Sequence, residues 1–294
     1  MRLGATSLSA TKPGAVRKYA TASSSSSSSA ANFKNIDEYS YVRKRQFYST
    51  TDSCMACEVS PDGSKFYILQ GNPRRIRQYS LSTNFDISTS GSETSSFEPV
   101  VGSSGVTCFR FKPDGTRLFI ANYYGGVRYH DLSTPWDIST IGTASSITDI
   151  TSGRCSGMFF HPDGSYIFWI DPYRDRVYRT ELDTAWDTTG GLGTNTYSIL
   201  LDYSTTANMT IARDIFLNND GTKLYIAGQA SEKVVDYTLS PAYDISNFSG
   251  NADNTLSISA QENLALGLTF DPTGEHMYIA GAEAPDGVTQ WVRS

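Results

Sequence analysis

The sequence predicts an all-β protein, a closed five-bladed β-propeller whose blades have four strands each. The first observation is a repeat in which an Asp-Gly pair, with Thr-Gly as its fifth copy, recurs at intervals of 52, 49, 57 and 53 residues. The second is a short apolar run after every copy. The copies are Asp62-Gly63, Asp114-Gly115, Asp163-Gly164, Asp220-Gly221 and Thr273-Gly274. A fixed period near fifty residues, filled with short strand-like runs, is typical of propeller blades.

The first strand of each predicted blade ends shortly before the Asp-Gly pair and alternates large with mostly small residues. The small face holds Ala56, Cys108, Gly157, Asp214 and Gly267. This alternation fits an innermost strand, because blades crowd together toward the axis of a propeller. The Asp-Gly pair then forms the tight turn into the second strand.

The second and third strands follow each turn. The second strand is apolar on both faces, as expected where neighbouring blades cover both sides. Its five copies lie at 66–69, 118–121, 167–170, 224–227 and 277–280. The third strand is expected at 76–81, 127–132, 177–182, 234–239 and 288–292.

A second phrase, an aromatic residue followed by Asp, comes after the third strand in four blades. The copies are Phe85-Asp86, Trp136-Asp137, Trp186-Asp187 and Tyr243-Asp244. Asp and the neighbouring Pro residues preset and cap turns, so we expect the four rings to be structural plugs at the blade edge. Fourth strands are expected near 95–101, 144–151, 196–203 and 255–260.

The count of strands predicts how the ring closes. The chain ends after the third strand of the fifth blade, so that blade lacks a fourth strand of its own. Residues 39–48 alternate in the manner of a strand and precede the first blade. We expect them to complete the last blade, which would leave no exposed edge. The predicted propeller domain therefore spans residues 37–294.

The repeat resembles a known family at these residues. The combination of an Asp-Gly turn, an apolar strand and a Ser-Thr-Pro-Trp-Asp-Ile-Ser turn is similar to a blade repeat of bacteriophage virion and marine bacterial proteins. The resemblance covers about residues 40–294. It implies the propeller fold and a non-enzymatic structural or adhesin-like role, either in a phage tail or capsid or, as the alternative, as a bacterial surface or secreted adhesin.

Residues 1–36 are predicted to form an extended arm. They include seven consecutive serines, Ser23–Ser29, and such a segment cannot bury enough apolar surface to fold alone. Residues 1–34 carry five basic residues and no acid, whereas the rest of the chain has a net charge of −11. We expect Arg2, Lys12, Arg17 and Lys18 to anchor the arm on other virion structural proteins in a multi-subunit assembly. A solvated tail is the alternative.

Composition excludes several partners and compartments. Five dispersed basic residues on an acidic chain make no nucleic-acid-binding patch. No run approaches eighteen apolar residues, so no membrane insertion is predicted. The first twenty residues have no apolar core of the kind a cleaved secretory signal requires. The expected location is the virion, with the bacterial surface or extracellular space as the alternative.

No cofactor or metal site is predicted. Cys54 and Cys57 form a CxxC pair, but residues three apart on a regular strand point to opposite faces and cannot both bind one ion. We expect these thiols, with Cys108 and Cys155, to be small core residues. The three histidines fall at different places in their blades and do not converge. They are His130, His161 and His276.

An enzymatic site is not predicted either. Some five-bladed propellers carry catalytic carboxylates around the central channel. Here the axial positions offer Asp214, with Glu58 and Arg110 two residues further along their own strands. One carboxylate is not a pair, and the Asp of the Asp-Gly turns recurs in every blade, which indicates a structural role. A channel-centred glycan hydrolase stays as the weaker alternative.

The loops between second and third strands differ from blade to blade and are expected on one face of the propeller. Three of them carry aromatic or Arg residues, which are enriched in recognition surfaces. The candidate receptor- or glycan-binding residues are Arg74, Tyr123, Tyr124, Tyr173 and Arg174. Ordinary exposed loop residues packing on one another would give the same pattern, and the sequence leaves both interpretations open.

Overall fold

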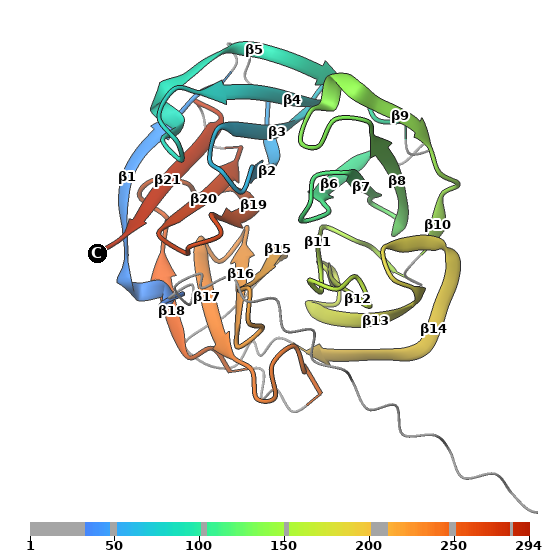
Figure 1. Ribbon diagram of the computed structural model, residues 1–294. Coiled ribbons are helices and arrows are strands. Elements are labelled where there is room, and N and C mark those ends of the chain that lie inside the picture. Colours follow the sequence, from blue (N-terminus) through green and yellow to red (C-terminus); the bar gives the residue numbers. More distant parts are fainter. Residues whose placement is uncertain are drawn as a thin grey trace, which may run out of the picture. The chain divides into compact units, whose positions relative to one another are not determined.

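A computed structural model gives the structure of residues 33–47, 52–100, 105–149, 153–200, 211–246, 251–282 and 285–294, without the side chains of 191–200. The described chain forms five antiparallel sheets arranged as the blades of a propeller (Figure 1). The innermost strands contact one another in the order β2, β6, β11, β15, β19 and back to β2. The predicted all-β, five-bladed fold is therefore confirmed.

Each blade runs outward from its innermost strand. Blade 1 contains β2 (Cys54–Val59), β3 (Lys65–Gly71), β4 (Arg74–Leu81) and β5 (Ser90–Phe97). Blade 2 contains β6 (Val106–Phe111), β7 (Arg117–Asn122) and β8 (Gly126–Leu132), and both β9 (Ile141–Ala144) and β10 (Thr148–Asp149) pair with β8. Blade 3 contains β11 (Gly157–Phe160), β12 (Tyr166–Asp171), β13 (Arg176–Thr184) and β14 (Asp187–Leu200). Blade 4 contains β15 (Ala212–Leu217), β16 (Lys223–Gly228), β17 (Lys233–Thr238) and β18 (Asn254–Ser257).

Blade 5 joins the two ends of the described chain. Its inner strands are β19 (Ala265–Phe270), β20 (His276–Gly281) and β21 (Gly287–Arg293), and β1 (Tyr39–Arg45) pairs antiparallel with β21 as the fourth strand. In Figure 1 the blue β1 lies beside the red β21. The ring therefore closes through the N-terminal strand, as the strand count predicts.

The fourth strands of the first three blades begin earlier than expected. β5 begins at Ser90, β9 at Ile141 and β14 at Asp187, whereas the sequence analysis placed them near residues 95, 144 and 196. The reason is the turn before them. In blades 1 and 2 the aromatic-Asp phrase takes only one short 3₁₀ turn, Ile87–Thr89 or Ile138–Thr140, and the chain extends again at once; in blade 3 the strand begins at Asp187 itself.

The small positions of the innermost strands lie where neighbouring blades crowd together. A methyl group added at Gly157 would come within 2.6 Å of the Asp214 Cα atom, and one added at Gly267 would come equally close to the Ala56 Cα atom. Real side-chain carbons do not approach backbone so closely, so these positions require glycine. The expected crowding of the innermost strands is confirmed.

The repeated turns are built from the same contacts in each blade. The turn glycines have φ between 70° and 78°, a conformation that glycine adopts without strain. The aspartates accept a hydrogen bond from a backbone N–H two residues on, for example Asp62 from Ser64 at 3.0 Å. Each plug ring lies on the turn glycine of its own blade, and its backbone N–H donates to that glycine's carbonyl oxygen, as Trp136 does to Gly115 at 3.0 Å. The rings are therefore structural plugs.

The fifth plug comes from the N-terminal segment. Phe33 lies against Gly274 and packs on Phe216 and Phe270, with ring centroids 5.9 Å apart in both pairs. Ile36 is fully buried, and its N–H donates to an Asp236 carboxylate oxygen at 2.6 Å. Residues 33–36, which the sequence analysis placed with the arm, thus pack on the propeller. Residues 1–32 lie outside the described residues.

Candidate functional site

The loop face carries a cluster of aromatic and arginine side chains between blades 2 and 3. Tyr123 and Tyr124 follow β7, and Tyr173 follows β12. The Tyr123 ring centroid lies 5.5 Å from that of Tyr124 and 6.2 Å from that of Tyr173. Arg154, which precedes β11, lies over both neighbouring rings, 3.6 Å from the Tyr173 centroid and 4.9 Å from that of Tyr123. We call these four residues, with Arg174, the tyrosine–arginine cluster.

Two side chains at the ends of strands hold the cluster in place. The buried carboxylate of Asp171 accepts from the backbone N–H of Tyr173 at 2.9 Å and from the guanidinium of Arg174 at 3.1 Å. The side-chain oxygen of Asn122 accepts from the backbone N–H of Tyr124 at 3.0 Å. Such local side-chain to backbone bonds fix a turn. The two turns therefore present their tyrosines from a fixed backbone.

A recess of about 300 Å³ lies within the cluster, lined by Tyr124, Gly153, Arg154, Asp171, Tyr173 and Arg174. Tyr124 and Tyr173 are 61% and 67% exposed, among the most exposed large hydrophobic side chains of the described chain. Arg213 of blade 4 lies close enough to interact electrostatically with Tyr123 and Tyr173, and burial lowers the pKa of its guanidinium. The recess thus combines exposed rings with several cationic side chains and one buried carboxylate.

Four of the five predicted loop residues come together here, and Arg74 does not. The Arg74 guanidinium donates to the backbone carbonyl oxygen of Val106 and lies against the sulfur of Met55. It also lies so close to Gly105 that a methyl group there would overlap it. Arg74 therefore joins blade 1 to the start of β6. Arg154 was not predicted, because it precedes the innermost strand β11 and lies outside the variable loops between second and third strands.

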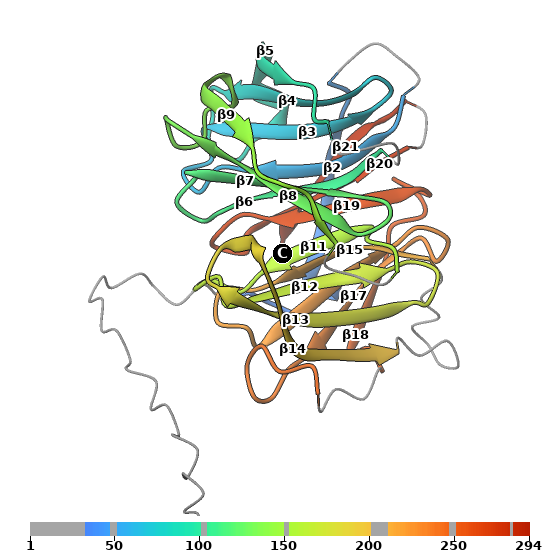
Figure 2. The ribbon, with the colours of Figure 1, turned by 90° about the vertical axis from the view of Figure 1, so that its right-hand side faces the viewer.

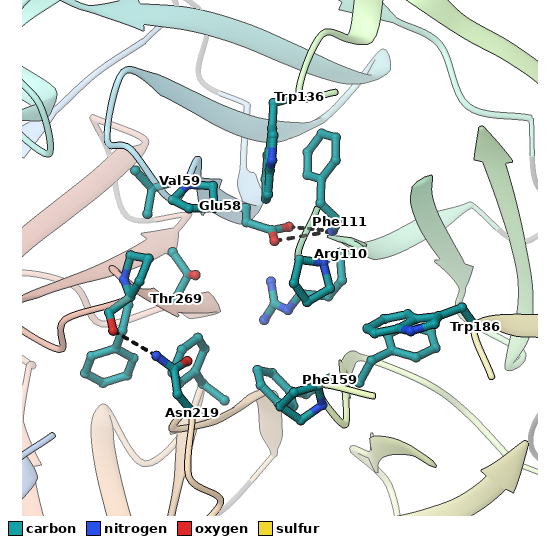
Figure 3. Close-up of a pocket in the computed structure, with 16 residues that line it drawn as sticks. Glu58, Val59, Arg110, Phe111, Trp136, Phe159, Trp186, Asn219 and Thr269 are labelled. Atoms are coloured by element: carbon teal, nitrogen blue, oxygen red, sulfur yellow. Dashed lines mark hydrogen bonds between the residues drawn. The ribbon is translucent and has the colours of Figure 1, made fainter. Parts of the chain in front are cut away.

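The opposite ends of the strands surround a second cavity, of about 250 Å³, at the mouth of the central channel (Figure 3). Its walls are mostly apolar, formed by rings and by prolines of the Asp-Gly turns. The lining residues nearest the axis are Glu58, Arg110, Phe159, Phe216 and Thr269, one from each innermost strand. We call this space the axial cavity.

A buried ion pair forms the floor of the axial cavity. The Arg110 guanidinium, 4% exposed, donates to an Asp214 carboxylate oxygen at 2.8 Å and to the Leu268 carbonyl oxygen at 3.0 Å. Asp214 also accepts from the backbone N–H groups of Ile215 and Leu268, at 2.9 and 2.8 Å. Burial would lower the pKa of Arg110, but Asp214 and Glu58 raise it above its usual value. The guanidinium and Asp214 thus form a buried ion pair, while the Arg110 Nε has no hydrogen-bond partner among the described residues.

Glu58 differs from Asp214 in its surroundings. Its carboxylate oxygens accept one backbone donor, the N–H of Phe111, at 3.0 and 3.3 Å. Burial among the apolar walls raises the pKa of Glu58 to about 8, although Arg110 and the Phe111 N–H lower it. The side chain is still partly exposed within the cavity. Glu58 is therefore a carboxyl group that is largely protonated at neutral pH.

The cysteines and histidines take up other roles. All four cysteines are buried and free, and burial raises the pKa of the Cys57 thiol. Cys54 and Cys57 do not point to opposite faces as predicted, because the register shifts between Cys54 and Ala56, which breaks the alternation, and both thiols enter one apolar cluster. Within the described ranges, no group of three His, Cys, Asp or Glu side chains could hold a metal ion.

The histidines are engaged locally. His130 Nδ1 lies 2.9 Å from the Gly142 carbonyl oxygen, His161 Nδ1 lies 2.6 Å from Asp163, and His276 Nδ1 lies 2.9 Å from Asp271. No helix in the part of the chain that the structure describes is long and apolar enough to cross a bilayer. The predicted anchoring residues of the arm, Arg2, Lys12, Arg17 and Lys18, lie outside the described residues.

Comparisons with known proteins show similarity at the level of structure. The chain matches no protein-family model and no curated protein sequence. One similar solved structure is a functionally unknown protein from Desulfotomaculum acetoxidans DSM 771, with a TM-score of 0.45 and 13% identity over 78% of this chain. Another is described as a "putative 6-phosphogluconolactonase" from Bacteroides uniformis ATCC 8492, with a TM-score of 0.45 and 15% identity over 81% of this chain. The chain spans 62% and 67% of these two neighbours, respectively.

Proposed function

We propose that this protein is a non-enzymatic recognition component of an assembled particle, a virion, in which the propeller displays the tyrosine–arginine cluster for binding a glycan. The observation that carries the proposal is the pair of exposed rings, Tyr124 and Tyr173, beside a recess of about 300 Å³ with Arg154 and Arg174 on its walls. Aromatic and arginine side chains around a recess are the residues on which recognition depends most strongly.

The chemistry of the recess suits a carbohydrate that carries a negative charge. An exposed tyrosine ring offers a flat apolar face to the C–H face of a sugar, while the arginines donate to hydroxyl or carboxylate oxygens. Arg154 is held over the Tyr173 ring by a cation–π contact at 3.6 Å. The ring and the guanidinium are thus already oriented before a ligand arrives, which lowers the ordering cost of binding.

The axial cavity supports binding better than hydrolysis. Glycosidases use two carboxyl groups, one on each side of the bond that breaks. In this cavity the second carboxyl group, Asp214, is occupied by Arg110 and two backbone N–H groups. Glu58 alone is free to meet a ligand, so we favour a binding role for the chain.

A glycan array with the full-length protein tests the recognition part. Tyr124→Ala and Tyr173→Ala should each weaken binding by about 1–3 kcal/mol, about five- to 150-fold in Kd. Tyr41→Ala is the matched control, because Tyr41 is also exposed (41%) but lies on β1 of blade 5. Unchanged binding in both cluster variants would move the contact to the opposite face, where the plug rings lie.

The assembly part rests on the arm, whose first 34 residues carry five basic residues and no acid. Removing residues 1–31 should leave a folded propeller that no longer co-purifies with particles. Incorporation at the full-length level would remove the reason to call the arm an anchor. Recovery of the protein in a bacterial cell envelope, with none in particles, would favour the surface adhesin instead.

A further inference from the structure

The axial cavity is asymmetric although the propeller is built from repeats. Five equivalent positions, one on each innermost strand, surround the axis at its mouth. Blades 1 and 2 place Glu58 and Arg110 there, blades 3 and 4 place Phe159 and Phe216, and blade 5 places Thr269. The two rings meet edge to face with centroids 5.2 Å apart. One side of the mouth is therefore polar and the other aromatic.

Further apolar groups line the rim outside both the polar and the aromatic side. Trp136 and Trp186, the plug rings of blades 2 and 3, line the rim, and four of the five Asp-Gly turns contribute a proline. In Figure 3 the Glu58 carboxyl group and the Phe159 ring enter the cavity from different sides. A ligand in this space would contact rings and prolines over most of its surface and meet one carboxyl group.

Glu58 forms no ion pair with a cationic side chain among the described residues. Arg110 is the nearest cation, but its terminal nitrogens donate to Asp214 and to the carbonyl oxygens of Phe109, Ile215 and Leu268. The other ionisable groups that face Glu58 are Asp214 on β15 and Tyr67 on β3, and neither supplies positive charge. A positive group inside the cavity would therefore favour the ionised form of Glu58 and pair with it directly.

We propose that the axial cavity binds a small organic ammonium ion, with its charged nitrogen at Glu58 and its apolar body against Phe159, Phe216 and the tryptophan rim. Aromatic walls favour this ligand, because a cation is attracted to the face of an aromatic ring. This site lies at the opposite end of the strands from the tyrosine–arginine cluster, so it does not depend on the glycan proposal.

Two other ligand classes fit less well. An anion would need Arg110, which is buried and whose terminal nitrogens already donate to Asp214 and to backbone carbonyl oxygens, and it would face Glu58 as well. A neutral sugar would bring several hydroxyl groups into walls formed mostly by prolines and rings, where most of them would stay unpaired. The ammonium ion needs only one strong acceptor.

The test is calorimetric titration of the full-length protein with three probes that share a 2-phenylethyl group: 2-phenylethylamine, 2-phenylethanol and 3-phenylpropanoate. We expect the amine to bind at least about tenfold more tightly than the alcohol or the acid. Glu58→Gln keeps the shape and an acceptor for the Phe111 N–H but loses the charge, so it should bind the amine at the level of the alcohol. Tyr173→Ala, at the other end of the strands, should leave amine binding unchanged.

A second measurement on the wild-type protein does not depend on any variant. A cation beside Glu58 favours its ionised form, so binding at pH 7 should release close to one proton, measured as the dependence of the binding enthalpy on the buffer. Affinity for the permanently charged 2-phenylethyl(trimethyl)ammonium should rise about tenfold per pH unit below pH 8 and level off above it.

Three results would overturn the proposal: equal binding of amine and alcohol, undiminished amine binding by a folded Glu58→Gln variant, or no binding of any probe. Loss of glycan binding in the cluster variants together with unchanged amine binding would show that the two sites bind their ligands independently.

Discussion

The two ends of the blades differ in how regular they are. At the end that carries the Asp-Gly turns, which we call the turn end, the same contact recurs from blade to blade. At the end that carries the loops between second and third strands, which we call the loop end, the loops differ between blades. At the turn end, the backbone N–H groups of Phe85, Trp136, Trp186 and Tyr243 donate to the carbonyl oxygens of the turn glycines at 2.8–3.1 Å. At the loop end, blade 1 uses Arg74 to join blade 2, whereas blades 2 and 3 expose tyrosines around a recess. Figure 2 shows the blades from the side, with both ends of the strands visible.

The difference separates residues that hold the propeller from residues that are free to bind. The plug ring of a blade is tied to the turn of its own blade and to the preceding blade: the Trp136 carbonyl oxygen of blade 2 accepts from Tyr67 and from Lys65 of blade 1. The exposed tyrosine rings of the tyrosine–arginine cluster do not recur from blade to blade, so we do not expect the blades to depend on them for stability. The comparison therefore predicts large stability effects at the turn end and small ones in the tyrosine–arginine cluster.

The largest effect is expected from removing the N-terminal segment that closes the ring. Deleting residues 33–45 removes Phe33, Ile36 and the whole of β1, which leaves β21 unpaired and exposes the apolar interior of blade 5. An open sheet edge and an uncovered core are both costly. We expect loss of the cooperative transition in thermal melting.

The control deletion removes residues 1–31 and keeps Phe33. Its melting temperature should stay within a few degrees of the full-length value. If the 33–45 deletion melts cooperatively at the wild-type temperature, the closure of the ring by β1 is not what stabilises it.

The sequence predicted the closing strand but not the closing plug. Residues 39–48 alternate and the last blade lacked a strand, so the pairing followed from counting. Phe33 and Ile36 perform in blade 5 what the plug ring and Ile87 perform in blade 1, yet they lie at the other end of the chain. Their phrase, Asn-Phe-Lys-Asn-Ile, also has one residue more than Asn-Phe-Asp-Ile in blade 1. Because they directly follow the Ser-rich segment, Phe33 and Ile36 were predicted to belong to the arm.

The next prediction compares the loss of stability on removing one ring from each end of the blades. Trp136→Ala removes an indole that packs on Phe111 with ring centroids 4.7 Å apart and covers Gly115. Truncation of a largely buried aromatic ring should lower the free energy of unfolding by about 2–4 kcal/mol. Tyr173→Ala, at an exposed position, should change it by less than about 0.5 kcal/mol. Chemical denaturation of both variants measures the difference, and equal losses would break the distinction between the two ends.

The tyrosine–arginine cluster and the axial cavity could be predicted only in part, because some of their contacts join residues that are far apart in the repeat pattern. Tyr123, Tyr124, Tyr173 and Arg174 stood out because their loops depart from the repeat. Arg154 lies in a different kind of connection, the one that leads into β11, and only the fold brings it over Tyr173. Likewise Glu58, Arg110 and Asp214 were recognised as axial, but the pairing of Arg110 with Asp214, which leaves Glu58 without an ion pair among the described residues, depends on side-chain geometry across the channel.

A smaller effect at the turn end depends on pH. Because burial raises the pKa of Glu58 from 4.5 to about 8, the folded state holds a proton between these values that the unfolded state releases. Wild-type stability is therefore lost as pH rises through this window. Glu58→Gln has no such proton, so its stability relative to wild type should increase by about 1–2 kcal/mol between pH 5 and pH 9, discounted for the partial exposure of Glu58. A difference that stays constant with pH would contradict the raised pKa.

The last prediction compares two arginines at the loop end. Their removal should have the smallest effects on stability, but it should affect glycan affinity in only one of the two variants. Arg74→Ala removes the donor to the Val106 carbonyl oxygen and should cost about 1 kcal/mol of stability while leaving glycan binding unchanged. Arg154→Ala removes a partly exposed guanidinium that lies over two rings, and should cost less than about 0.5 kcal/mol but weaken binding at least about fivefold. Arg154→Lys keeps the charge but loses the planar stacking, so it should recover only part of the affinity. Melting curves and glycan titration on the same three variants decide the matter. If Arg74→Ala loses binding and Arg154→Ala does not, the recognition surface lies at the junction of blades 1 and 2, and the recess between blades 2 and 3 is only a place where loop residues pack on one another.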